Sequence, residues 1–134
     1  MPEQRCFAFF RCANSSEISI ELQQRQVQEY CRAMGYILFS EITSDQPCTE
    51  EQARQIATIY RKEMGENYPL KMIVLNLHRL GNDIHLVRRV ASIFKEYDIE
   101  VESTCTYDNS LLALTEQDEY EFYQALMGTS IRNF

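Results

Sequence analysis

Two short runs of the sequence are apolar almost without a break: RCFAFFR at residues 5–11 and LKMIVLNL at residues 70–77. A strand with one solvated face carries a polar residue at every second position, so uninterrupted apolar runs indicate strands that are covered on both faces. Parallel sheets flanked by helices bury their strands in this way. The chain must therefore supply helices that cover both faces of a sheet.

Helical patterns occupy the segments between the strand-like runs. Apolar residues recur at helical spacing within residues 19–34, 49–64 and 84–97, and Gly35 and Gly65 follow the first two at positions where helices commonly end. Strand-like segments at 36–42, 99–104 and 110–114 and a final helix at 116–127 complete the pattern. This order predicts an α/β protein with three layers, αβα, around a mainly parallel, five-stranded sheet.

Composition excludes several classes of protein. The chain has 134 residues, enough for one domain, and no apolar stretch approaches the roughly 20 residues of a membrane span. Five cysteines without a CxxC pair favour free thiols in a reducing compartment, so we expect a cytoplasmic protein that does not contact a membrane. Two isolated histidines predict no metal site, and the absence of a glycine-rich phosphate loop predicts no nucleotide cofactor.

Charge is distributed unevenly along the sequence. The net charge is −7, which excludes binding of nucleic acid by bulk charge. Residues 71–95 nevertheless contain five Lys and Arg residues and one acid, whereas residues 96–121 contain nine acids and no Lys or Arg. Two interpretations stay open: two solvated faces of opposite charge, or a local anion site in the first segment.

Three segments at expected strand and helix ends carry the residues that bear on function. Residues 9–13 are FFRCA, residues 19–26 are SIELQQRQ, and residues 77–83 are LHRLGND. In this order they resemble three patterns of the serine recombinases, the resolvase and invertase family: aromatic-x-Arg-x-Ser, Ser-(Ile/Leu)-x-x-Gln, and Leu-Asp-Arg-Leu-Gly-Arg-Asp. The resemblance extends over about residues 5–127 and implies a resolvase-like, flavodoxin-like fold.

The resemblance also implies roles for individual residues. In that family a serine hydroxyl attacks a DNA phosphodiester, and arginines surround the phosphate because negative charge builds on its oxygens in the transition state. Arg11 and Arg79 fall on two such arginines and Gln23 falls on the first-helix glutamine, which implies that these three residues bind phosphate or DNA. Glu41 falls on the acid after the second strand, and Asp83 on the last motif aspartate.

Three positions depart from the family pattern. Ala13 stands at the nucleophile position, and a methyl group cannot attack phosphorus. His78 replaces the motif aspartate, and Asn82 replaces the second motif arginine. The resemblance therefore implies a serine site-specific DNA recombinase type of domain that is catalytically inactive or impaired.

Two alternatives stay open. A one-residue insertion between Arg11 and Ser19 would let Ser15 or Ser16 act as a displaced nucleophile in an active DNA recombinase, although serines commonly support a loop or a helix start at such sites. The second alternative is a non-enzymatic α/β module for protein interaction or ligand sensing, which predicts that Arg11 and Arg79 do not converge.

The last predicted helix, residues 116–127, is rich in aromatic residues on one side. In the resembled family a long helix here forms the dimer interface and leads to the DNA, which implies a homodimer or higher oligomer; packing on the domain's own sheet is the other interpretation. No helix-turn-helix or zinc-ribbon pattern follows before Phe134. We therefore expect residues 1–134 to form a resolvase-type N-terminal catalytic-like domain, without a DNA-binding domain, that reaches DNA through a missing or separate domain.

Overall fold

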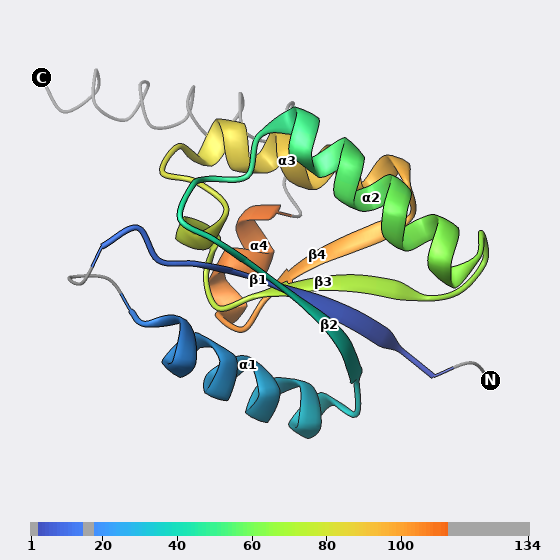
Figure 1. The fold of residues 1–134 in the computed structure, drawn as a ribbon, viewed down its shortest axis with the longest axis horizontal. Helices are drawn as coiled ribbons and strands as arrows, with labels where there is room; N and C mark the ends of the chain where they lie inside the picture. The colour runs from blue at the N-terminus through green and yellow to red at the C-terminus, as the bar shows by residue number, and fades with distance from the viewer. Residues whose placement is uncertain (1–2, 15–17, 113–134) are drawn as a thin grey trace, which may run out of the picture.

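A computed structural model describes residues 3–14 and 18–112 of the chain, and its centre is a four-stranded parallel sheet (Figure 1). The strands are β1 (Arg5–Arg11), β2 (Ile37–Ser44), β3 (Leu70–Val74) and β4 (Ile99–Ser103), in the spatial order β2-β1-β3-β4. All three neighbouring pairs are parallel. The two apolar runs of the sequence thus form the two central strands, β1 and β3.

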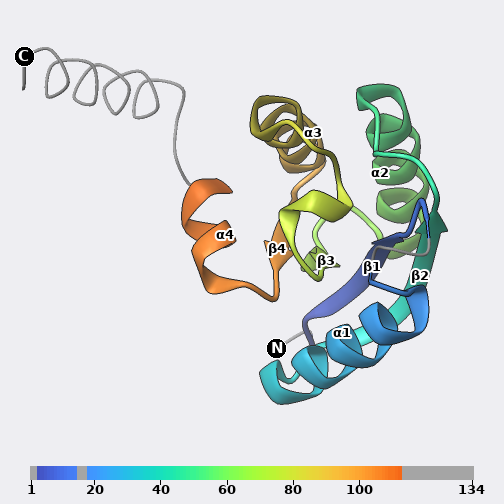
Figure 2. The same cartoon turned by 90° about the vertical axis from the view of Figure 1, so that its left-hand side faces the viewer.

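Helices cover the sheet on both faces, so the predicted three-layer α/β fold is confirmed. Helix α1 (Ile20–Met34) lies on one face, and α2 (Glu50–Met64) and α3 (Ile84–Glu96) lie on the other (Figure 2). Alternate residues of β1 serve the two cores: Cys6, Ala8 and Phe10 pack with Val27 and Cys31 of α1, whereas Phe7 and Phe9 belong to the core under α2 and α3.

The helix ends follow from local sequence. The Ser19 hydroxyl accepts a hydrogen bond from the Leu22 N–H at the start of α1, and Thr49 and Gln52 form a reciprocal capping box at the start of α2. Gly35 ends α1 with a φ of 75°, a left-handed conformation that side chains disfavour. These ends match the sequence prediction within one residue.

The predicted fifth strand at residues 110–114 is wrong, because residues 110–112 belong to helix α4 (Thr106–Leu112). Asn109 of α4 explains the difference: its side-chain amide accepts from the Ser103 N–H at 2.7 Å and donates to the Ser103 carbonyl at 2.9 Å. One carboxamide therefore occupies the edge of β4 where a strand would pair. Leu111 and Leu112, which gave the segment its strand-like pattern, instead pack against the core.

Strand β3 ends at Val74, earlier than the predicted residue 77, because the chain turns into the short 3₁₀ helix η1 (Leu77–Arg79). This turn buries Leu77 and Leu80 in the core and brings Arg79 to the carboxyl edge of the sheet. Within the described ranges, every helix is too short or too polar to cross a lipid bilayer.

Candidate anion site at the carboxyl edge of the sheet

Arg11 is the last residue of β1 and is only 5% exposed. Its Nη2 donates to the His78 carbonyl at 2.6 Å and to Asn82 Oδ1 at 3.1 Å, which ties the end of β1 to the connection between β3 and α3. Both acceptors are neutral, so they leave the positive charge of Arg11 uncancelled. Within the described residues no hydrogen bond engages Nε, whose surface is buried. The Arg11 guanidinium therefore keeps one buried N–H without a hydrogen-bond partner among the described residues.

Arg79 lies directly against Arg11. Its Nη1 donates to the carbonyl of Arg11 at 2.9 Å, and its Nε donates to Asn76 Oδ1 at 3.3 Å. Arg79 is 8% exposed, and η1 holds it there because the turn buries Leu77 and Leu80 on either side of it. The two arginines that the resemblance assigns to a phosphate site therefore meet at one point of the sheet edge.

Gln23 is fully buried and completes the end of β1 from the side of α1. Its Oε1 accepts from the Arg11 N–H at 3.2 Å, and its Nε2 donates to the carbonyls of Arg11 and Ile18, both at 2.8 Å. All of these contacts are to backbone. The structure thus places Gln23 with the two arginines, as a brace between α1 and β1.

Of the remaining motif positions, His78 and Asp83 lie in the connection that contains Arg79, whereas Glu41 lies elsewhere. His78 offers its backbone carbonyl to Arg11, while its side chain is exposed. Asp83 caps α3, accepting from the His85 N–H at 2.9 Å. Glu41 is not at this site: it lies on β2 and accepts hydrogen bonds from Gln24 and Gln28 of α1.

Ala13 is exposed, two residues beyond the end of β1. The expected nucleophile position therefore presents a methyl group to solvent, two residues after Arg11. Ser15 and Ser16 lie outside the described residues, as does the predicted helix at 116–127. Among the residues that the structure describes, no three His, Cys, Asp or Glu side chains gather as metal ligands.

Sequence analysis missed two residues that shape the site. Asn76 holds the Nε of Arg79, and Asp108 of α4 accepts from the Leu77 N–H and from the Ser103 hydroxyl, both at 3.0 Å. The sequence could have identified Asn76, because it is the polar residue that interrupts the apolar run LKMIVLNL just before the motif. No sequence pattern identifies Asp108, because only the fold brings it close to Leu77 and Ser103.

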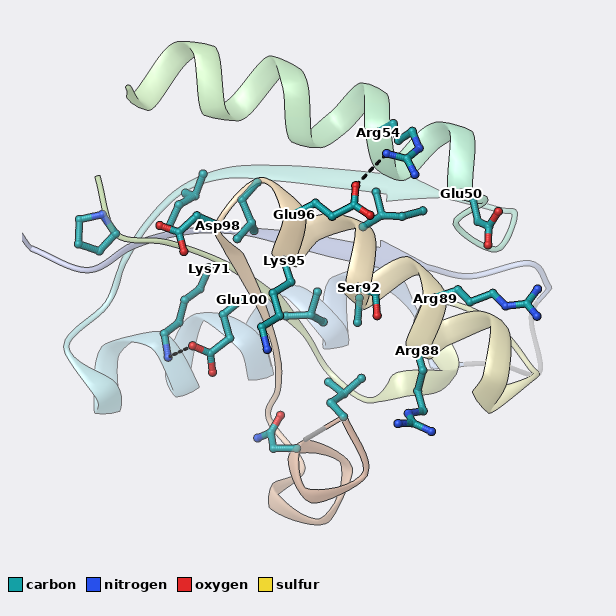
Figure 3. A pocket seen from close by; sticks show the side chains of 18 of the residues that line it. Glu50, Arg54, Lys71, Arg88, Arg89, Ser92, Lys95, Glu96, Asp98 and Glu100 are labelled. Carbon is teal, nitrogen blue, oxygen red and sulfur yellow. Dashed lines mark hydrogen bonds and ion pairs between the residues drawn. The ribbon is translucent and has the colours of Figure 1, made fainter. Parts of the chain in front are cut away.

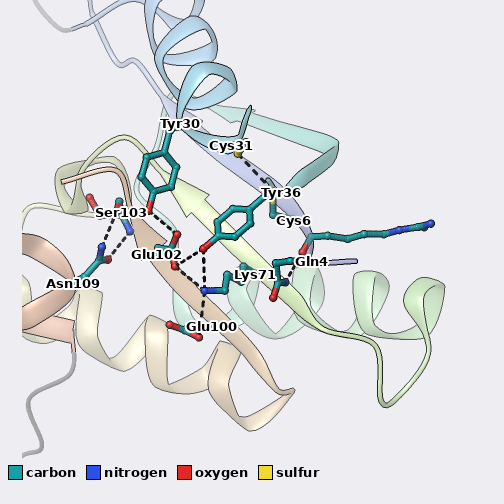
Figure 4. A network of polar contacts seen from close by, with 11 residues as sticks. Gln4, Cys6, Tyr30, Cys31, Tyr36, Lys71, Glu100, Glu102, Ser103 and Asn109 are labelled. Carbon is teal, nitrogen blue, oxygen red and sulfur yellow. Dashed lines mark hydrogen bonds and ion pairs between the residues drawn. The ribbon is translucent and has the colours of Figure 1, made fainter. Parts of the chain in front are cut away.

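A second polar network, away from the arginine pair, was also missed (Figure 4). Glu102 of β4 accepts from Lys71 at 2.7 Å, from Tyr30 at 2.7 Å and from Tyr36 at 3.2 Å. Burial alone would raise the pKa of Glu102, but these three hydrogen bonds outweigh burial and hold its pKa below the ordinary value. Burial and the bond to Glu102 both raise the pKa of Tyr30. The network links α1 to the edge of the sheet.

The fold is similar to that of known recombinase domains. The N-terminal catalytic domain of TP901-1 integrase superposes with a TM-score of 0.64 at 16% identity, covering 92% of this chain and 98% of that one. The C-terminal catalytic domain of ISC1926 TnpA, an IS607-like serine recombinase, gives 0.59 at 12% identity, covering 93% and 80%. A resolvase family site-specific recombinase from Streptococcus pneumoniae gives 0.60 at 14% identity, covering 98% of both chains.

These likenesses define the class of the fold. The chain has the resolvase-like fold of serine recombinase catalytic domains, and the resemblance predicted from its three motifs is confirmed at that level. No protein-family model matches the sequence, and no curated protein matches it.

Proposed function

We propose that this chain is a serine recombinase type of domain that takes part in DNA recombination without cutting DNA itself. The observation that carries the proposal is the exposed methyl group of Ala13, two residues after Arg11 of the buried pair of Arg11 and Arg79. The positive charges of the two arginines attract a phosphate, whereas the hydroxyl oxygen expected to attack it is missing at position 13. The domain would then act by pairing with a second copy or with an active relative on DNA.

The loss of a second cation supports the same proposal. Asn82 stands where the resembled motif has an arginine, and its amide oxygen binds Arg11 within the chain. A neutral amide cannot offset the charge that builds on phosphate oxygens in the transition state, and one lost donor of this kind costs about 3 kcal/mol or more. An intact nucleophile alone would therefore give a weak enzyme.

The two alternatives have different standing. An active recombinase that uses Ser15 or Ser16 requires side chains that lie outside the described residues, and it still lacks the arginine at position 82. A module unrelated to DNA predicts that Arg11 and Arg79 lie apart, and their contact through the Arg11 carbonyl counts against it.

The test is a search for a covalent protein–DNA adduct. The full chain is incubated with a supercoiled plasmid library that carries fragments of the source genome, and the mixture is denatured with SDS to retain only covalent products. We expect no adduct from the wild-type chain, whereas an active serine recombinase with its own site gives one in parallel. An adduct that disappears in Ser15→Ala or Ser16→Ala would show a working displaced nucleophile and overturn the proposal.

A further inference from the structure

The outer face of α3 is basic. The inner face of this helix buries Val87, Val90, Ile93 and Phe94 against the sheet. The outward positions, which we call the α3 basic face, are His85, Arg88, Arg89, Ser92 and Lys95. Glu96 is the single acid of α3, and Arg54 of α2 neutralises it at 3.0 Å.

Two charges of this face are uncompensated. Arg89 and Lys95 are exposed and make no hydrogen bond or ion pair within residues 3–14 and 18–112. Lys71 on the neighbouring strand differs, because Glu102 at 2.7 Å and Glu100 at 3.7 Å hold it. A protein of net charge −7 therefore displays unneutralised cations at one place on its surface.

The α3 basic face borders a groove of about 1080 Å³ that follows the edge strand β4 between α3 and α4. Figure 3 shows Arg88 and Arg89 projecting from α3 at one end of this groove, and Lys71, Asp98 and Glu100 gathered at the other. The first half of α3 supplies Arg88 and Arg89 at one end of the groove, and Glu50 of α2 lies at the same end. Helix α3 begins at Ile84, two residues after Asn82, whose amide oxygen binds Arg11.

We propose that the α3 basic face binds the phosphate backbone of duplex DNA, which rests on the proposed function and adds a surface to it. From His85 to Lys95 the face is about 15 Å long, and duplex DNA carries one charge per about 1.7 Å, so several phosphates lie within its reach. Guanidinium groups grip phosphate oxygens with paired N–H donors, and the Ser92 hydroxyl adds a neutral donor. The buried arginine pair cannot make this first contact, because both side chains are turned into the chain.

The test compares two double variants of the full chain that remove the same charge. Arg89→Gln with Lys95→Gln changes the basic face, whereas Arg25→Gln with Lys62→Gln changes exposed bases of α1 and α2, one in mid-helix and one in a last turn as in α3. Binding of a fluorescent duplex of about 30 bp is followed by anisotropy from about 20 to 200 mM salt. We expect the first variant to lose at least tenfold in affinity and about 1.8 in the slope of log K against log salt, and the control to lose less than about twofold.

Three results would contradict the proposal that the α3 basic face binds duplex DNA. Equal losses in both variants would show an effect of net charge alone, and failure of the wild-type chain to bind at about 20 mM salt would show that the face holds no duplex. Stronger displacement by an acidic peptide than by unlabelled duplex would assign the face to an acidic protein. A covalent adduct in the same mixtures after SDS would instead overturn the proposed inactivity, so the two proposals fail separately.

Discussion

Gln23 shows most clearly how single residues of the site now act within the fold. Its carboxamide is fully buried, and it binds the backbone N–H and carbonyl of Arg11 together with the carbonyl of Ile18. The motif assigns Gln23 to phosphate binding, but its described hydrogen bonds are all to the backbone of the same chain. The end of β1 and the start of α1 are held in register by one side chain.

Replacing Gln23 should accordingly affect stability first. In Gln23→Leu the buried Arg11 N–H loses its acceptor and the partly buried Ile18 carbonyl loses its donor, which costs about 1–3 kcal/mol of unfolding free energy. Urea denaturation followed by circular dichroism measures the change, with Gln26→Leu on the exposed face of α1 as the matched control. A loss no larger than in the control would show that the buried amide is not a brace.

For single residues, the sequence predicted where the site residues lie better than it predicted their hydrogen-bond partners. The motifs placed Arg11, Gln23 and Arg79 together, and the structure does the same. Which atoms they bind was not predictable, because Gln23 and Arg79 both donate to the Arg11 carbonyl, which lies 12 and 68 residues away from them along the chain. Sequence patterns encode residue types and carry no record of such contacts.

Among the elements, β4 combines apolar packing, through Ile99 and Val101, with a network of charged and polar side chains around Glu102. Glu102 joins β4 to Lys71 of β3 and to Tyr30 of α1. Glu102→Gln leaves the ammonium of Lys71 without its nearer carboxylate in a mostly buried place, and we expect a loss of about 2–3 kcal/mol at neutral pH. Glu100→Gln, at 3.7 Å from Lys71 and 70% exposed, is the control and should lose less than about 1 kcal/mol.

The same network predicts a pH dependence with a definite sign. The pKa of Glu102 is lower in the folded chain than its ordinary value of 4.5, so its contribution is complete above that value and is lost as the pH falls below it. The stability difference between wild type and Glu102→Gln should therefore shrink in urea titrations as the pH falls below 4.5. A difference that stays constant through this range would show that ionised Glu102 does not contribute.

Helix α4 shows why one element escaped sequence analysis. The ends of α1 and α2 were predictable because Ser19, Thr49 and Gly35 act on their own helices. Helix α4 is fixed instead by Asp108 and Asn109, whose side chains reach the backbones of Leu77 and Ser103. Local sequence propensity predicts contacts within one helix, such as caps, and does not predict contacts between segments that are distant in the sequence.

Removing the Asp108 carboxylate should therefore loosen α4 and η1 together. In Asp108→Ala the Leu77 N–H and the Ser103 hydroxyl lose an acceptor, at a cost of about 1–3 kcal/mol. Hydrogen exchange should speed up at Leu77 and across α4, while Ser110→Ala, an exposed position of the same helix, should leave both unchanged. Unchanged exchange at Leu77 in Asp108→Ala would contradict the tether.

For the whole molecule, the five cysteines report on the three-layer arrangement. Cys6 and Cys31 lie between β1 and α1 with their sulfurs 3.6 Å apart, and Cys48 is buried where the loop before α2 meets the core. Cys105 is exposed and Cys12 is partly exposed. All five are free thiols, so the layers are held together without a covalent link.

This arrangement predicts which thiols react with a reagent such as DTNB. Burial raises the pKa of the Cys48 thiol to about 11, and the hydrogen bond to Cys31, followed by burial, raises that of Cys6, so both stay protonated and unreactive near neutral pH. The hydrogen bond to Cys6 lowers the pKa of Cys31, but Cys31 is only 2% exposed. We therefore expect only Cys105 and Cys12 to react in the native protein, and all five cysteines to react in guanidinium chloride. Cys105→Ser should remove the faster native phase and leave the buried thiols protected. Reaction of a third thiol without denaturant, at a rate independent of unfolding, would mean that α1 or α2 does not cover the sheet as described.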